Sequence, residues 1–150
     1  MKSTEQLKIP GYKICKLNCT ECLADGSAIV VKYNIQHKLY DDFDTDVLAV
    51  EIQRSLGSII ILTTYLPPRR HNLPFIDIYR LLNNSIRNYI IADFNARYKH
   101  FVNSDNKIVG ESLINLINQC KLIHLGLYFP LYLHTNSATT LDRIISNKNH

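Results

Sequence analysis

The stretch Ile90-Ile91-Ala92-Asp93-Phe94-Asn95-Ala96 decides how the rest of the chain is interpreted. The apolar run at residues 89–91 predicts a short buried strand that delivers Asp93 to its end. Side chains alternate along a strand, so Asp93 and Asn95 are expected on one side and Phe94 on the other. A carboxylate there can activate a water or hold a divalent metal, and an amide can orient a phosphate. An ordinary turn is the alternative, because Asp and Asn both favour turns.

A second strand is predicted at residues 58–64, where the chain reads Ser-Ile-Ile-Ile-Leu-Thr-Thr. The paired prolines Pro67 and Pro68 cannot donate to a β-ladder and therefore stop the strand. Tyr65 is thus expected at a strand end, where its phenol can donate to a phosphate oxygen or stabilise developing charge. The simpler interpretation is a tyrosine that caps the hydrophobic core.

Three motifs follow one another in the order and approximate spacing of a known superfamily: Tyr65-Leu66-Pro67-Pro68, Ala92-Asp93-Phe94-Asn95-Ala96 and Thr140-Leu141-Asp142-Arg143-Ile144-Ile145. The chain resembles the endonuclease/exonuclease/phosphatase superfamily, which includes DNase I. Within it, the resemblance is to the jockey-like endonuclease domains of non-LTR retrotransposons. It extends over most of the chain, from Ile9 onward.

The resemblance implies a set of site residues. Asp93 is similar to the family's water-activating aspartate, Asn95 to the asparagine that orients phosphate and metal ligands, and Tyr65 to the catalytic-site tyrosine. Asp142 is similar to the aspartate that orients a catalytic histidine. Glu5 is a weaker match to the metal-binding glutamate, because the chain reads Thr-Glu-Gln where the family has Glu-Thr.

The chain departs from the family pattern at both ends. The family's first strand is expected before Glu5 and its Ser-Asp-His motif after Asp142, and the sequence holds neither. His150 lacks the Ser-Asp context and lies too close to Asp142 to be the catalytic histidine. The expected fold is therefore α/β (α+β), a partial four-layered α/β/β/α sandwich. A single domain is expected at residues 1–150, incomplete at its N- and C-termini.

The composition and the first residues favour neither a membrane-spanning nor an exported protein. Hydrophobic residues make up 46% and charged residues 20% of 150 residues, which is ordinary for a globular domain. No run approaches the ~20 apolar residues of a membrane span, and the first residues lack the apolar core of a signal peptide. An intracellular protein is expected, in the nucleus or the cytoplasm and without a membrane partner.

Basic residues gather between residues 69 and 99, around both candidate catalytic motifs. They are Arg69, Arg70, Arg80, Arg87, Arg97 and Lys99, whereas an acidic cluster of Asp41, Asp42, Asp44 and Asp46 lies elsewhere. Such a stretch can contact a phosphate backbone, and an ordinary solvated face is the alternative. Arg97, Arg69 and Arg70 are the candidate phosphate contacts because a guanidinium binds phosphate in a bidentate manner. His134, near a predicted strand end, is a further candidate for contact with DNA.

Three cysteines, Cys15, Cys19 and Cys22, have the C-x3-C-x2-C spacing of the cluster site in radical SAM enzymes. The repeating βα pattern of such a barrel does not follow, and a zinc site would need a fourth ligand with suitable spacing. Free thiols are the favoured interpretation in an intracellular protein.

Further strands are predicted at 12–17, 27–33, 47–53, 123–125, 131–134 and 141–146, and amphipathic helices at 74–82 and 109–120. By resemblance, the function is that of a Mg²⁺-dependent DNA endonuclease, with Mn²⁺ as the alternative ion. It would nick target DNA to prime a reverse transcriptase domain downstream on the same chain. Activity is expected to be weak or absent because the histidine motif is missing. The alternative is a non-catalytic remnant that binds nucleic acid weakly at most.

Overall fold

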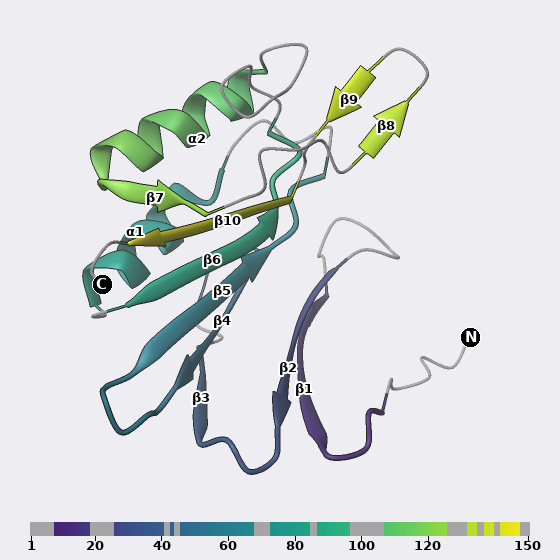
Figure 1. Cartoon of the computed structure of the whole chain (residues 1–150), viewed down its shortest axis with the longest axis vertical. Helices are drawn as coiled ribbons and strands as arrows, with labels where there is room; N and C mark the ends of the chain where they lie inside the picture. The colour runs from purple at the N-terminus through teal and green to yellow at the C-terminus, as the bar shows by residue number, and fades with distance from the viewer. Residues whose placement is uncertain are drawn as a thin grey trace.

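A six-stranded sheet forms the centre of the part of the chain that the structure describes (Figure 1). The structure is a computed structural model, and it describes residues 8–18, 26–40, 43, 46–67, 73–84, 87–96, 107–125, 132–134, 137–139 and 142–147. The strand order is β3-β4-β5-β6-β10-β7. The bounds are β3 His37–Tyr40, β4 Val47–Ile52, β5 Ile59–Thr64, β6 Asn88–Asp93, β10 Asp142–Asn147 and β7 Leu122–His124. Only β5 and β6 pair in parallel; the other neighbours in this sheet are antiparallel.

Two helices cover one face of this sheet, α1 at Phe75–Asn84 and α2 at Ile108–Gln119. In α1, Ile78 and Leu81 are buried while Ile76 and Tyr79 are exposed, which is the pattern of an amphipathic helix. Pro74 precedes the first turn, where the missing N–H of a proline costs nothing. The buried side of α2 packs with strand residues such as Ile90 into the larger of two hydrophobic clusters.

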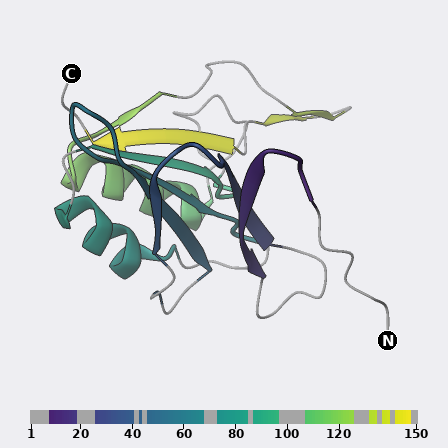
Figure 2. The same cartoon turned by 90° about the horizontal axis from the view of Figure 1, so that it is seen from below.

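A two-stranded sheet lies over the opposite face. It consists of β1 at Tyr12–Asn18 and β2 at Gly26–Lys32, paired antiparallel. Figure 2 shows the helices and this hairpin on opposite sides of the central sheet. Cys15 and Val31 from the hairpin pack against Leu48 and Val50 of β4. Strand β4 is therefore buried on both faces, which explains its nearly continuous apolar sequence.

The expected fold class is confirmed. The described residues provide three of the layers, with α1 and α2, then the six-stranded sheet, then β1 and β2. The strands and helices predicted from periodicity all occur, with ends shifted by no more than two residues. Two short strands were not predicted, β3 and β9 at Ser137–Thr139, which pairs with β8 at Tyr132–His134. Both are short and rich in polar residues, so only pairing with a neighbour identifies them. No helix in the described ranges is long and apolar enough to span a membrane.

Candidate active site at one end of the central sheet

Three of the predicted site residues meet at adjacent strand ends. Asp93 is the last residue of β6, and it pairs in register with Asp142, the first residue of β10. Tyr65 directly follows β5 and forms an isolated parallel bridge with Asp93. Paired residues in neighbouring strands have Cα atoms about 4.5–5.5 Å apart. Figure 1 shows the ends of β5 and β6 and the start of β10 at the same end of the sheet.

A hydrogen-bonded turn follows Asp93 and joins the exits of β5 and β6. The backbone N–H of Asn95 donates to Oδ1 of Asp93 over 2.9 Å. The Asn95 side chain donates through Nδ2 to the carbonyl of Leu66 over 2.8 Å, and the Leu66 N–H donates to the carbonyl of Asp93 over 2.9 Å. Phe94, between them, is fully buried in the larger hydrophobic cluster and anchors the turn. One oxygen of the Asp93 carboxylate is therefore held by the backbone of its own turn.

The strand geometry expected beyond Asp93 is wrong. Strand β6 ends at Asp93, and Asn95 has a φ of 46°, in the left-handed region that Asn tolerates better than most residues. Alternation along an extended strand therefore does not bring Asn95 beside Asp93; a turn does, because the Asp93 carboxylate accepts the Asn95 N–H. The sequence offered two interpretations of Asp93 and Asn95, a polar pair at a strand end and an ordinary turn. In the structure the turn is what forms the polar pair.

Several predicted site residues cannot be placed in this way. Glu5, Arg69, Arg70 and Arg97 lie outside the described residues. His134 ends strand β8, and the β8–β9 hairpin lies at the same end of the central sheet as the start of β10 (Figures 1 and 2). For Asp142 and His134 the structure describes the backbone, and their register positions are what is known of them.

The basic stretch does not gather around this site where the structure describes it. Arg80 lies on α1, in the layer on the helix side of the sheet, with its side chain 59% exposed and 3.8 Å from Asp77. Arg87 directly precedes β6 and so lies at the opposite end of that strand from Asp93, about 20 Å away at the rise of a β-strand. The exposed Arg80 fits the ordinary solvated face that the sequence left as the alternative, and neither arginine lies at the site.

Asp46, which was expected from the sequence to belong to an acidic cluster away from the candidate motifs, lies next to the site, so that placement is wrong for this residue. Val47 pairs with Thr64 between β4 and β5, so Asp46 is the register neighbour of Tyr65. The hydroxyl of Thr64 donates to the Asp46 carbonyl over 2.7 Å. Asp46 and Tyr65 line a small cavity of about 10 Å³ with residues of the β1–β2 hairpin. The β4–β5 hairpin was predictable, and extending its register by one residue would have placed Asp46 beside Tyr65.

A divalent metal ion at these strand ends would need oxygen ligands. Carboxylate and amide oxygens, as on Asp93 and Asn95, are ligands that Mg²⁺ accepts. No group of three or more His, Cys, Asp or Glu gathers among the residues that the structure describes. The predicted ligand Glu5 lies outside these residues.

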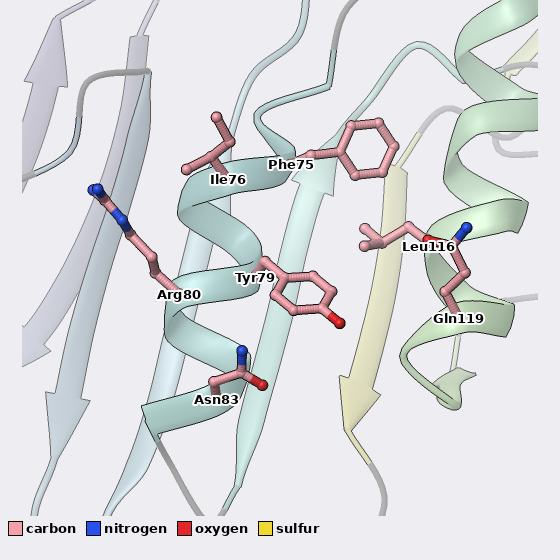
Figure 3. A pocket seen from close by; sticks show the side chains of 7 residues that line it. All are labelled: Phe75, Ile76, Tyr79, Arg80, Asn83, Leu116 and Gln119. Carbon is pink, nitrogen blue, oxygen red and sulfur yellow. The ribbon is translucent and has the colours of Figure 1, made fainter.

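A much larger cavity than the one beside Tyr65 lies elsewhere. A groove of about 570 Å³ lies between α1 and α2 and is lined mainly by apolar side chains, including Phe75, Tyr79 and Leu116 (Figure 3). It lies on the helix side of the sheet, and none of its lining residues is an acid, a histidine or a cysteine. The carboxylates that hydrolysis would need therefore lie at the strand ends and not in this groove.

Comparison with solved structures identifies the fold. The endonuclease domain of TRAS1, a telomere-specific non-LTR retrotransposon, matches with a TM-score of 0.75 at 14% identity, over 93% of this chain and 68% of that one. An endonuclease/exonuclease/phosphatase family protein from Leptotrichia buccalis C-1013-b matches at 0.58 and 14% identity, over 91% and 60%. ANGEL2, a 2′,3′-cyclic phosphatase, matches at 0.57 and 16% identity, over 91% and 63%.

No protein-family model and no curated protein sequence matches the chain. The chain spans between 60% and 68% of the length of these three structures. At 14–16% identity the likeness concerns the fold, and the three structures agree on which fold it is. The chain therefore has the fold that these three structures share, which is the DNase I-like fold expected from its sequence motifs.

Proposed function

We propose that this chain carries part of the catalytic site of a metal-dependent DNA endonuclease, of the type found in non-LTR retrotransposons. The observation that supports the proposal is the alignment of Tyr65, Asp93 and Asp142 at adjacent strand ends, with Asn95 hydrogen-bonded between two of the exits. The solved structure with the highest TM-score of the three compared is a retrotransposon endonuclease domain. In the proposal the partners are DNA and a reverse transcriptase domain downstream on the same chain, and the location is the nucleus.

The proposed reaction is hydrolysis of a phosphodiester bond. Mg²⁺, or Mn²⁺ in its place, would polarise a phosphate oxygen and lower the pKa of a bound water. Asp93 would hold and deprotonate the attacking water, because the Asn95 N–H fixes the orientation of its carboxylate. Tyr65 would donate its phenol proton as a hydrogen bond to a non-bridging phosphate oxygen as negative charge develops.

The remaining two residues have supporting roles. One amide N–H of Asn95 is already given to the Leu66 carbonyl, which leaves its second N–H and its oxygen to orient the phosphate. Asp142 would orient a histidine that the sequence does not contain in the expected motif. Arg69, Arg70, Arg97 and His134 remain the proposed contacts to the DNA backbone, and Glu5 the proposed metal ligand.

A plasmid-nicking assay tests this proposal. The whole chain should convert supercoiled plasmid to the nicked form in Mg²⁺ and not in EDTA. The rate should be about 10²–10⁴-fold below that of a complete site, because one acid–base or charge-stabilising group typically contributes that much. Asp93→Ala should abolish the activity. Glu111→Gln, an exposed carboxylate on α2, is the matched control and should leave it unchanged.

Two outcomes of this assay would contradict the proposal. Nicking that is unaffected by Asp93→Ala would overturn the site assignment. A chain that shifts labelled DNA in a gel but never nicks it, with Mg²⁺ or with Mn²⁺, would favour the non-catalytic remnant instead.

A further inference from the structure

Four strands of the central sheet end in one continuous row of polar residues. Asp46 precedes β4, Tyr65 follows β5, Asp93 closes β6 and Asp142 opens β10, and each is the register neighbour of the next. Neighbouring strands are about 4.8 Å apart, so the row spans roughly 14 Å. Tyr65 therefore lies between Asp46 and Asp93, at about the same distance from each.

Burial shows which face of the sheet Asp46 and Tyr65 share. The paired residues one step inward, Val47 and Thr64, are 1% and 3% exposed, and Val47 belongs to the cluster beneath the helices. Successive residues of a strand point to opposite faces. Asp46 and Tyr65 therefore point away from the helices, toward the β1–β2 hairpin, as do Leu48 and Val50.

The space between Asp46 and Tyr65 is small and closed on one side. Leu17, Gly26 and Ser27 of the hairpin line the same cavity, whose volume is about 10 Å³. A cavity needs roughly 10–15 Å³ to hold a single water. Asp46 and Tyr65 thus share a space no larger than one water molecule, and side chains on one face of neighbouring strands are within reach of one another.

The backbone of Asp46 is also fixed. Its carbonyl accepts the hydroxyl of Thr64, which is the residue that precedes Tyr65. This bond does not use the Asp46 carboxylate, so the side chain can be changed without removing it. A carboxylate is an acceptor and a phenol is a donor, so the two groups are complementary.

From this geometry we infer that Asp46 is a positioning residue for Tyr65, an inference that rests on the proposed function of the site. The Asp46 carboxylate accepts a hydrogen bond from the Tyr65 hydroxyl, directly or through one water. This hydrogen bond holds the tyrosine ring in one orientation before substrate binds. A phosphate oxygen that reaches the strand end then competes with Asp46 for the hydrogen bond from the Tyr65 hydroxyl, which is already oriented. Asp46 touches neither the phosphate nor the metal in this scheme.

The orientation of the phenol is measurable without any activity. We would place 3-fluorotyrosine at position 65 of the whole chain and record its ¹⁹F spectrum. Asp46→Asn and Asp46→Ala should both move or broaden the ¹⁹F resonance by more than its linewidth, whereas Glu111→Gln should not. Thermal melting of each variant establishes that it is folded. Folded Asp46 variants with an unchanged ¹⁹F resonance would overturn the inference.

The consequence for catalysis is measured with a double-mutant cycle in the plasmid assay. Asp46→Ala should lower kcat about 10-fold, on the scale of one lost oriented hydrogen bond, with a smaller effect on KM. In a Tyr65→Phe background the same change should have no further effect, because the group through which Asp46 acts is gone. Fully additive losses would show that Asp46 acts independently of Tyr65 and would overturn the inference.

The two readouts separate two kinds of failure. If the parent chain nicks no DNA but the ¹⁹F resonance responds to Asp46, the proposed function fails and the positioning contact stands. If the parent chain nicks DNA in an Asp93-dependent manner and the resonance does not respond, the function stands and the role of Asp46 fails.

Discussion

The two faces of the central sheet carry similar apolar side chains but are covered very differently. Ile90 and Ile91 are adjacent in β6, yet Ile90 is 1% exposed beneath the helices and Ile91 is 45% exposed on the other face. Strand β10 shows the same contrast, with Ile145 at 0% and Ile144, the register partner of Ile91, at 38%. On that second face the β1–β2 hairpin packs over β4 and β5, whereas Ile91 of β6 and Ile144 of β10 remain exposed. An apolar side chain is therefore buried only where a second layer stands over it.

The open face is also the face of the candidate site. By alternation along β6, Asp93 lies on the side of Ile91 and not on the side of Ile90. The helix-covered face supplies most of the core, and the other face carries the polar row at its end. Stability and proposed chemistry are thus assigned to opposite sides of one sheet.

The sharpest test of this contrast uses the neighbouring isoleucines. Ile90→Ala should lower the free energy of unfolding by about 2–5 kcal/mol, because it leaves a cavity in a closed core. Ile91→Ala should lower it by less than about 1 kcal/mol, because its side chain is already half in water. Urea denaturation of the two variants measures both. Equal losses would mean that the second face is covered in solution.

Amide exchange should separate the two sides more finely. A two-stranded sheet held by a small cluster opens more easily than strands in the larger cluster. Amides of β1 and β2 should therefore exchange at least about 100-fold faster than those in the middle of β5 and β6. Native-state hydrogen exchange followed by mass spectrometry gives this ratio, and equal protection would show that the hairpin and the helical side open as one unit.

The exposed pair on β6 and β10 should promote self-association. Contiguous exposed apolar side chains commonly do so. Replacing Ile91 and Ile144 together by lysine should reduce association in sedimentation velocity while changing the free energy of unfolding by no more than about 1 kcal/mol. Ile76→Lys is the matched control, because Ile76 is 72% exposed on the outer side of α1. If that control reduces association as much, the helices and not the open face are the contact.

The smallest expected effect is at strand β3, which lies at one edge of the sheet, on the face that the helices cover. The Tyr40 hydroxyl donates to Oε2 of Glu51 over 2.7 Å. Hydrogen bonds from Ser58 and then from Tyr40 lower the pKa of Glu51, and the bond to Glu51, burial and the Glu51 charge raise the pKa of Tyr40. Tyr40→Phe should cost about 1 kcal/mol near neutral pH.

The pH dependence of that cost has a definite sign. A lowered carboxyl pKa stabilises the fold above the unfolded-state pKa of Glu51, and this contribution is lost as pH falls through the lowered value. A raised phenol pKa stabilises below the unfolded-state pKa of Tyr40, and the contribution is lost as pH rises through the raised value. The difference between parent and Tyr40→Phe should therefore be largest between these limits and shrink in acid. A difference that stays constant down to pH 2–3 would contradict this account.

Local sequence signals were sufficient for most of the architecture. The β-prone run before Tyr65, the amphipathic spacing of Leu113 and Leu116, and the paired prolines each act over a few residues. The motifs around Asp93 and Asp142 were sufficient to identify the superfamily fold, because their order and spacing are specific. The proximity of Tyr65, Asp93 and Asp142 followed from that resemblance, and the strand register places all three at one end of the sheet.

Tertiary structure decided what local signals do not contain. Identical neighbours such as Ile90 and Ile91 differ in burial because one faces the helices and the other an uncovered part of the sheet. Asn95 leaves the strand in a left-handed turn because Asp93 and Leu66, the latter from another strand exit, both hydrogen-bond to it. Asp46 joins the site through pairing between β4 and β5. The amino-acid sequence thus determined which segments become strands and helices, whereas the register and stacking of those segments, which depend on residues far apart in the chain, decided which side chains meet.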